Sequence, residues 1–215
     1  MIANNPNRPD PRLLFDPAEA RLEPPPRAFF RRDTELVARA LVGMHIARRF
    51  RGRWYGARIV ETEAYLGVAD RAAHSWGGRR TERVAPMWAD GGRLYVFLVY
   101  GMHHCANVVT RREGVPEAVL LRAAEGPPGG AAPPRLLSGP GKLCAALGIT
   151  TADSGLDLLG GGPVTVLRGR GRRPRLGVSP RIGVDYAAEA KDWRLRFFDT
   201  ESSAVSKAPS RRGGA

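Results

Sequence analysis

The 215-residue sequence has few cysteines, few lysines and no long apolar run. Its two cysteines, Cys105 and Cys144, stand far apart and outside any CxxC pattern, so they predict neither a disulfide framework nor a zinc motif. No run of eighteen apolar residues occurs, so no membrane span is expected. The N-terminal residues are rich in proline and charge and lack the apolar core of a secretory signal. We therefore expect a reducing, cytoplasmic compartment.

Positive charge dominates the composition. Lysine and arginine total 34 against 21 acidic residues, which gives a formal net charge of +13, and only three of the 34 are lysines. Arginine's planar guanidinium binds phosphates through two hydrogen bonds and stacks on rings. A GC-rich genome would explain the preference for arginine over lysine, but not the excess of base over acid. That excess favours nucleic acid as a partner, with an anionic membrane surface second.

The length suits one domain, and the 43% hydrophobic fraction is enough for a core. Proline and charge at the N-terminus predict a loosely ordered arm over residues 1–26. The folded domain is expected over 27–200, followed by a disordered basic tail over 201–215.

Alternating residues and turn signals predict a mostly antiparallel sheet with short helices. Asp33 is placed to cap a helix over 34–41, and a second short helix is expected over 141–147. Strands are expected over 45–50, 53–65, 93–100, 104–110, 118–123, 163–167 and 193–198. The first two would turn at Arg51-Gly52, and the next two would form a hairpin with Tyr100 and Met102 at its tip.

Three side chains suited to chemistry share one face of the strand expected over 53–65. Glu61, Glu63 and Tyr65 alternate along it, so they leave the same side of the sheet. Two carboxylates roughly 7 Å apart on one strand face suit an acid/base pair of glycosidase type. The alternative is that both glutamates pair with nearby arginines. His74 would return an imidazole to the same pocket, although a purely structural histidine explains it equally well.

The expected hairpin tip carries large apolar side chains where a turn is normally polar. Proteins that take a base out of a duplex often insert an apolar wedge into the stack, and Tyr100 suits that role, with Met102 beside it. Tyr95 and Phe97 would build a pocket wall, with ordinary core packing as the alternative for Tyr95.

Further polar side chains surround this hairpin. His103, Cys105 and Asn107 share a strand face, but no third ligand stands at a useful spacing, so no metal site is predicted. Asn107 suits the discrimination of purine edges. Arg122 ends an apolar strand and could hold a phosphate or a carboxylate. Lys142, at the start of a short helix, adds an anion site without the Walker pattern.

Taken in order, these motifs resemble the alkyladenine (3-methyladenine or methylpurine) DNA glycosylases. The similar runs are RIVETEAYLG from Arg58, AAHS from Ala72, GGRRT from Gly77, LYVFLVYGM from Leu94, Asn107, LLRA from Leu120, GPGKLC from Gly139, RIGVD from Arg181 and WRLRF from Trp193. They cover roughly residues 30–198 without a change of order.

The resemblance implies a single compact α+β domain around a curved, mostly antiparallel sheet, with short flanking helices and a protruding hairpin. It implies that Glu63 activates water and that Arg122 supports the water or the DNA backbone. It further implies a base pocket of Tyr65, Ala72, His74, Phe97 and Asn107, and DNA contacts from Thr81, Tyr100, Met102, His103 and Lys142. Phe97 stands where the family often has tyrosine, and His103-His104 stand where bulkier aromatics occur.

The implied function is base-excision repair. Such an enzyme flips an alkylated or deaminated purine out of double-stranded DNA and hydrolyses its N-glycosidic bond. With no lysine near Glu63 in the sequence, a monofunctional glycosylase is expected, acting as a monomer without cofactor, metal or membrane. Two alternatives remain: a non-catalytic nucleic-acid-binding module with the same aromatic pocket, and an enzyme of free nucleosides, which the charge disfavours.

Overall fold

The two strands predicted over residues 45–50 and 53–65 lie near the centre of the sheet. In the computed structural model, which describes residues 7–127, 129–169 and 172–206, β1 (His45–Phe50) and β2 (Arg53–Tyr65) pair antiparallel. Arg51 and Gly52 join them with φ of 49° and 78°. Two consecutive positive φ angles match the right-handed twist of a hairpin. The predicted turn is therefore confirmed.

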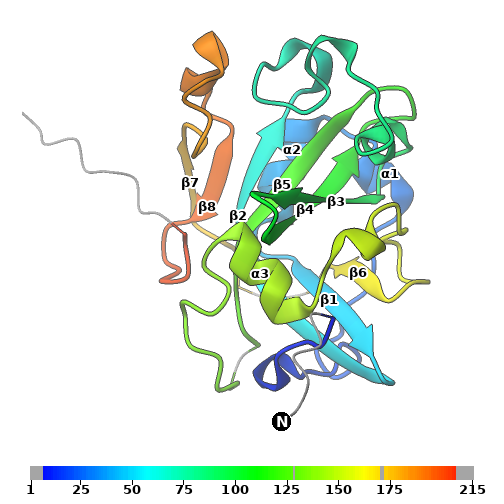
Figure 1. The fold of residues 1–215 in the computed structure, drawn as a ribbon. Helices are drawn as coiled ribbons and strands as arrows, with labels where there is room; N and C mark the ends of the chain where they lie inside the picture. Colours follow the sequence, from blue (N-terminus) through cyan, green and yellow to red (C-terminus); the bar gives the residue numbers. More distant parts are fainter. Residues whose placement is uncertain (1–6, 128, 170–171, 207–215) are drawn as a thin grey trace, which may run out of the picture.

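Eight strands form one sheet, which is not closed (Figure 1). The remaining strands are β3 (Leu94–Val99), β4 (His103–Thr110), β5 (Glu117–Glu125), β6 (Val164–Leu167), β7 (Leu176–Ser179) and β8 (Arg196–Asp199). The order is β3-β4-β5-β2-β1-β6, while β8 pairs with β2 and β7, all antiparallel. The predicted α+β domain around an antiparallel sheet is confirmed.

Few helices flank this sheet. α1 (Arg27–Phe30) and α2 (Thr34–Leu41) lie behind it in the view of Figure 1, and α3 (Pro140–Leu147) lies in front. The Asp33 carboxylate accepts hydrogen bonds from the N–H groups of Glu35 and Leu36, as expected for a helix cap. The short 3-10 turns are Pro11–Leu13, Gly67–Ala69, Trp76–Gly78, Ala85–Trp88, Thr151–Asp153 and Ala188–Asp192.

The C-terminal strands differ from the sequence prediction. β7 was not expected, because its four residues include a glycine and carry little alternation. The strand expected over 193–198 begins only at Arg196, since the 3-10 turn Ala188–Asp192 precedes it and Trp193 follows as its cap. β8 nevertheless pairs with β2, and β7 pairs with β8, and this places Arg196 beside the predicted site.

The described part of the N-terminal arm packs on the domain. Leu13 is fully buried, and Phe15 donates its N–H to the carbonyl of Trp54 in β2. Apolar side chains between the prolines thus contact the domain within residues 7–26, and the predicted arm stays a prediction. Residues 201–206 likewise contact the sheet. Residues 1–6 and 207–215, where the rest of the predicted arm and tail falls, lie outside the described residues.

Candidate active site

Two adjacent β-bulges, one in β2 and one in β5, set the geometry of the site. Ile59 pairs with Ala124, Glu61 with Ala123, and Thr62 with Leu121, so the register shifts on both sides of Glu61. Val60 in β2 and Arg122 in β5 are each the extra residue of a bulge. Bulges redirect a side chain, and they occur next to functional sites. Here the Arg122 guanidinium reaches both Glu61 and Glu63.

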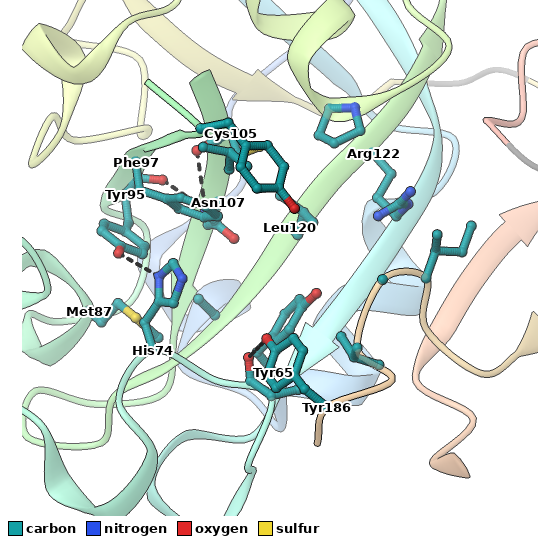
Figure 2. A pocket seen from close by; sticks show the side chains of 18 residues that line it. Tyr65, His74, Met87, Tyr95, Phe97, Cys105, Asn107, Leu120, Arg122 and Tyr186 are labelled. Atoms are coloured by element: carbon teal, nitrogen blue, oxygen red, sulfur yellow. Dashed lines mark hydrogen bonds between the residues drawn. The ribbon is translucent and has the colours of Figure 1, made fainter. Parts of the chain in front are cut away.

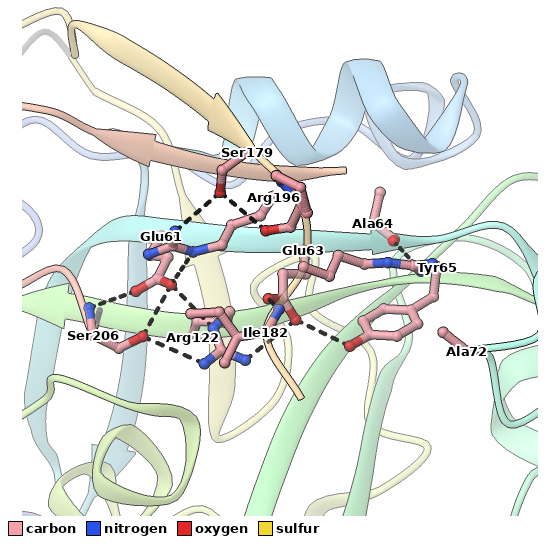
Figure 3. A network of polar contacts seen from close by, with 12 residues as sticks. Glu61, Glu63, Ala64, Tyr65, Ala72, Arg122, Ser179, Ile182, Arg196 and Ser206 are labelled. Atoms are coloured by element: carbon pink, nitrogen blue, oxygen red, sulfur yellow. Dashed lines mark hydrogen bonds and ion pairs between the residues drawn. The ribbon is translucent and has the colours of Figure 1, made fainter. Parts of the chain in front are cut away.

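Glu61 is enclosed by donors (Figure 3). Its Oε1 accepts from Arg122 Nε at 3.0 Å, Arg196 Nε at 2.7 Å and the Ser206 hydroxyl at 2.9 Å. Its Oε2 accepts from the Ser206 N–H at 2.7 Å. A buried carboxylate needs this compensation. Of the two interpretations of Glu61 from the sequence, the one supported by these contacts is pairing with arginines.

Glu63 has fewer charged partners, although its side chain is also 0% exposed. Its Oε2 accepts from the Tyr65 hydroxyl at 3.0 Å and Arg122 Nη1 at 3.2 Å, and its Oε1 accepts from the Ile182 N–H at 2.7 Å. Burial raises the pKa of Glu63 above its usual 4.5, and the charge of Arg122 opposes that rise. Shifted carboxyl groups of this kind are typical of active sites.

Tyr65 lies between this carboxylate and a buried arginine. The Arg181 guanidinium carbon is 4.7 Å from the Tyr65 ring centroid, and the guanidinium also forms a buried ion pair with Asp70. Arg181 donates to the carbonyls of Ala64 and Ala190 as well. One side chain thus joins β2, the loop that leads to His74 and the segment that brings Ile182 to Glu63.

A cavity of about 330 Å³ opens beside these residues (Figure 2). Its size is at the lower end of the range of small-molecule sites. Six aromatic or imidazole rings line it: Tyr65, His74, Tyr95, Phe97, Tyr100 and Tyr186. Ala72, Cys105, Asn107, Arg122 and Ile182 are among the other residues that line it. Arg122 therefore borders the cavity and contacts Glu63 at the same time.

His74 is fixed by two rings. Its Nδ1 is 2.8 Å from the Tyr95 hydroxyl, and its ring meets Phe97 edge-on with centroids 4.4 Å apart. Burial lowers the pKa of His74, and the charges of Arg83 and Arg79 lower it further. The imidazole is therefore neutral at pH 7. Burial also raises the pKa of Tyr95 to about 12, so its phenol keeps its proton.

Asn107 faces the cavity from β4. Its Nδ2 donates to the carbonyls of Tyr95 and Cys105, at 3.1 and 3.3 Å. The amide is therefore held in one orientation, as required of a group that discriminates between ligands.

The turn between β3 and β4 carries the most exposed aromatic side chain of the cavity. Tyr100 is 89% exposed and Met102 is 71% exposed. Tyr100 has a φ of 50° and Gly101 a φ of 69°, and the Met102 N–H donates to the Val99 carbonyl at 3.1 Å, so the chain reverses in a tight turn between the paired residues Val99 and His103. A non-glycine residue in this region of φ is uncommon and is found at functional sites. The predicted hairpin with these residues at its tip is confirmed.

Comparison with known proteins agrees with this geometry. The family model described as methylpurine-DNA glycosylase matches residues 28–203. The chain belongs to this family. A protein of Desulfitobacterium hafniense is 44% identical over 197 residues, which cover 84% of this chain and 97% of the relative. Relatives from Bdellovibrio bacteriovorus and Methanocella arvoryzae are 43% and 42% identical, over 85% of this chain and 98% and 95% of their own. All three carry the name "Putative 3-methyladenine DNA glycosylase".

The family resemblance predicted from the sequence is therefore confirmed. With it are confirmed a monofunctional DNA glycosylase and its place in base-excision repair. The described residues fit this chemistry in one further respect: neither Lys142 nor Lys191 lines the cavity of the glycosylase. A lysine nucleophile for Schiff-base chemistry is thus missing from the described part of its wall.

Most of the predicted site residues come together. Tyr65, Ala72, His74, Phe97, Tyr100, Asn107 and Arg122 line the glycosylase cavity, and Glu63 lies behind Tyr65 and Arg122. Thr81, Met102, His103 and Lys142 are exposed and do not line it. Sequence reasoning weighed Tyr95 mainly as a core residue and missed Ile182 and Tyr186. The run RIGVD was the available signal for Ile182, but no pattern pointed to Tyr186.

Within 7–127, 129–169 and 172–206, no three His, Cys, Asp or Glu side chains are grouped so as to hold a metal ion. In the same ranges, no helix has the length and apolar character needed to cross a bilayer.

Proposed function

We propose that the protein excises alkylated or deaminated purines from double-stranded DNA, with water activated by Glu63. The observation that carries this proposal is the position of Glu63. It is a buried carboxylate with a raised pKa, and Tyr65, Arg122 and the N–H of Ile182 separate it from an aromatic cavity. Since all three partners border that cavity, a flipped nucleotide in it would lie one side chain away from the carboxylate.

The cavity walls suit a flat ring. We expect a purine to stack on ring faces of the cavity such as those of Tyr65 and His74, while Phe97 meets the His74 ring edge-on and supports it. A cationic base such as 7-methylguanine gains about 0.5–2 kcal/mol from an aromatic face. A neutral His74 adds no competing charge, since its pKa is lowered. Ala72 leaves room beside the ring, and Asn107 would screen the purine edge.

Glu63 would act as the general base. In its ionised form it can orient a water molecule, remove its proton and stabilise the positive charge that develops on the sugar. The bond from Arg122 favours the ionised form, while burial makes the carboxylate more basic. A cationic base is a good leaving group and needs little acid assistance. The bond that breaks is the N-glycosidic bond, and the water oxygen ends on C1′.

Capture of the damaged nucleotide would depend on the hairpin tip. Tyr100 projects from the mouth of the cavity, where it can fill the space left in the base stack, with Met102 beside it. The exposed residues Thr81, His103 and Lys142 would contact the DNA backbone. The net charge of +13 favours such contacts and predicts binding that weakens steeply with salt. We expect the protein to act as a monomer and without a cofactor.

The test is single-turnover release of the base from duplex oligonucleotides that carry 7-methylguanine, hypoxanthine or ethenoadenine. Glu63→Gln should bind these duplexes like the wild type but release base about 10²–10⁴-fold more slowly. Glu35→Gln is the matched control, because Glu35 lies on α2 and pairs with Arg39 away from the cavity. Tight binding without release by the wild type would instead indicate a non-catalytic binding module. Equal release by wild type and Glu63→Gln would contradict the role of Glu63.

A further inference from the structure

The C-terminal segment, residues 202–206, covers the carboxylate of Glu61, which lies beside the proposed general base Glu63. Ala204 is buried with Val60 and Ala123, the residues at the bulge between β2 and β5. The Ser138 hydroxyl donates to the carbonyl of Val205 at 3.4 Å. These contacts place Ser206 next to Glu61. The family model ends at residue 203, so Ser206 lies beyond the part that it matches.

Ser206 supplies half of the hydrogen bonds that Glu61 accepts in the described part of the chain. Its N–H donates to Oε2 at 2.7 Å and its hydroxyl to Oε1 at 2.9 Å, while Arg122 and Arg196 donate the other two. Arg122 Nη2 also donates to the Ser206 hydroxyl at 3.4 Å. The serine therefore contacts both partners of the buried ion pair next to Glu63.

We propose that Ser206 is a positioning residue for base excision, which satisfies Glu61 so that Arg122 keeps its contact with Glu63. This inference rests on the proposed role of Glu63. Arg122 is shared between two buried carboxylates, with Nε on Glu61 and Nη1 on Glu63. Arg196 also binds Ser179 through Nη1, so it is less free to move. When Glu61 loses the Ser206 hydroxyl, Arg122 and Arg196 remain as its charged donors, and a turn of Arg122 toward Glu61 weakens its contact with Glu63.

The expected consequence is a change in the pH dependence of excision. The charged and titratable groups around Glu63 and Glu61 include Tyr65 on β2, Cys105 on β4, Arg122 on β5, Arg196 on β8, Tyr186, and Arg181, which stacks on Tyr65. Of these, Arg122 is the cation in contact with Glu63. A weaker contact leaves the ionised form of Glu63 less stabilised. Glu63 then stays protonated to higher pH, and the acid limb of the rate profile moves upward.

The experiment compares Ser206→Ala with Ser206→Thr, which keeps a hydroxyl, in the full-length protein. Single-turnover base release from a duplex containing 7-methylguanine is measured across the acid limb, together with duplex binding. Ser206→Ala should release base roughly tenfold more slowly below the midpoint of the limb, the effect expected for one hydrogen bond to a charged group. Its acid limb should lie at higher pH, binding should be unchanged, and Ser206→Thr should restore most of the rate.

Ser202→Ala is the matched control. Ser202 belongs to the same segment, but its hydroxyl donates to Glu125 at 2.8 Å and not to Glu61. Its rate and acid limb should match those of the wild type. An unchanged profile for folded Ser206→Ala would overturn the proposal, as would an equal change for Ser202→Ala. If the wild type releases base and Glu63→Gln does not, the proposed function stands whichever result Ser206 gives.

Discussion

The two ends of β2 are held in place by different kinds of interaction. At the site end, residues 61–65, two buried carboxylates are surrounded by arginine, serine and tyrosine donors. At the arm end, residues 53–57, the N-terminal arm packs on the strand, and Phe15 lies so close that Gly56 has no room for a side chain. Charge and hydrogen bonding fix the end next to the cavity, whereas close packing fixes the other. Changes at the site end should therefore alter activity, and changes at the arm end should alter stability alone.

The largest expected effect is the loss of activity and stability when a charged residue beside the site end of β2 is replaced. Arg122→Met leaves Glu61 and Glu63 buried with fewer positive partners, so we expect the free energy of unfolding to fall by about 3–5 kcal/mol. Base release should fall by about 10²-fold or more, because a charged group next to the reaction is lost. Arg12→Met breaks an exposed pair with Asp10 in the arm, which solvent screens, so it should leave both the free energy of unfolding and release nearly unchanged. Chemical unfolding and single-turnover release measure both. Similar losses from the two variants would contradict the comparison.

A second prediction concerns pH and the arm end. Burial lowers the pKa of His45 from 6.5 to about 4, and its Nδ1 has no hydrogen-bond partner among the described residues. The unfolded chain binds more protons than the folded protein between these two values. Stability therefore rises with pH through this window and is constant above about 6.5. Protonation of His45 should therefore lower the free energy of unfolding of the wild type by up to about 3 kcal/mol between pH 7 and pH 4.

His45→Gln removes this titration, so unfolding curves from pH 4 to pH 7 should show a smaller slope than in the wild type. Carboxylates contribute equally to both curves, and the difference between the proteins isolates His45. Parallel curves would show that His45 is not held in its neutral form. His74 provides the contrast at the site end, because its Nδ1 is paired with the Tyr95 hydroxyl.

The smallest expected effect is steric. A Cβ at Gly56 would lie 2.3 Å from Cε1 of Phe15, so Gly56→Ala must displace the ring. We expect a loss of about 1–3 kcal/mol in unfolding free energy, with base release unchanged. Adding Phe15→Ala removes the clash, so the double variant should lose less than the sum of the two single changes. An additive result would mean that the ring moves aside without cost.

Sequence patterns predicted the local parts of this arrangement well. Alternation placed Glu61, Glu63 and Tyr65 on one face, and the turn at Tyr100 followed from the apolar runs around it. Contacts across the chain could not be predicted this way. Glu61 meets Arg196 and Ser206 at separations of 135 and 145 residues, and no periodicity encodes such pairs. Tyr186 reaches the cavity from an irregular loop for the same reason.

Composition alone describes the N-terminus incompletely. Proline content predicted a loose arm, and the fully buried Leu13 anchors the described part of it. The average property of a segment says little when one side chain fits a specific site. For the cavity, by contrast, the residue types indicated the chemistry correctly. The bulge that directs Arg122 could not be predicted from the sequence.

The paired bulge at Val60 and Arg122 also constrains how this protein can change over evolutionary time. Because each strand carries one extra residue, the two shifts cancel, and the register beyond them is restored. Deleting either residue alone would turn one strand over and send its side chains to the opposite face. Insertions and deletions in this stretch should thus be tolerated only in compensating pairs, so that the two strands change length together.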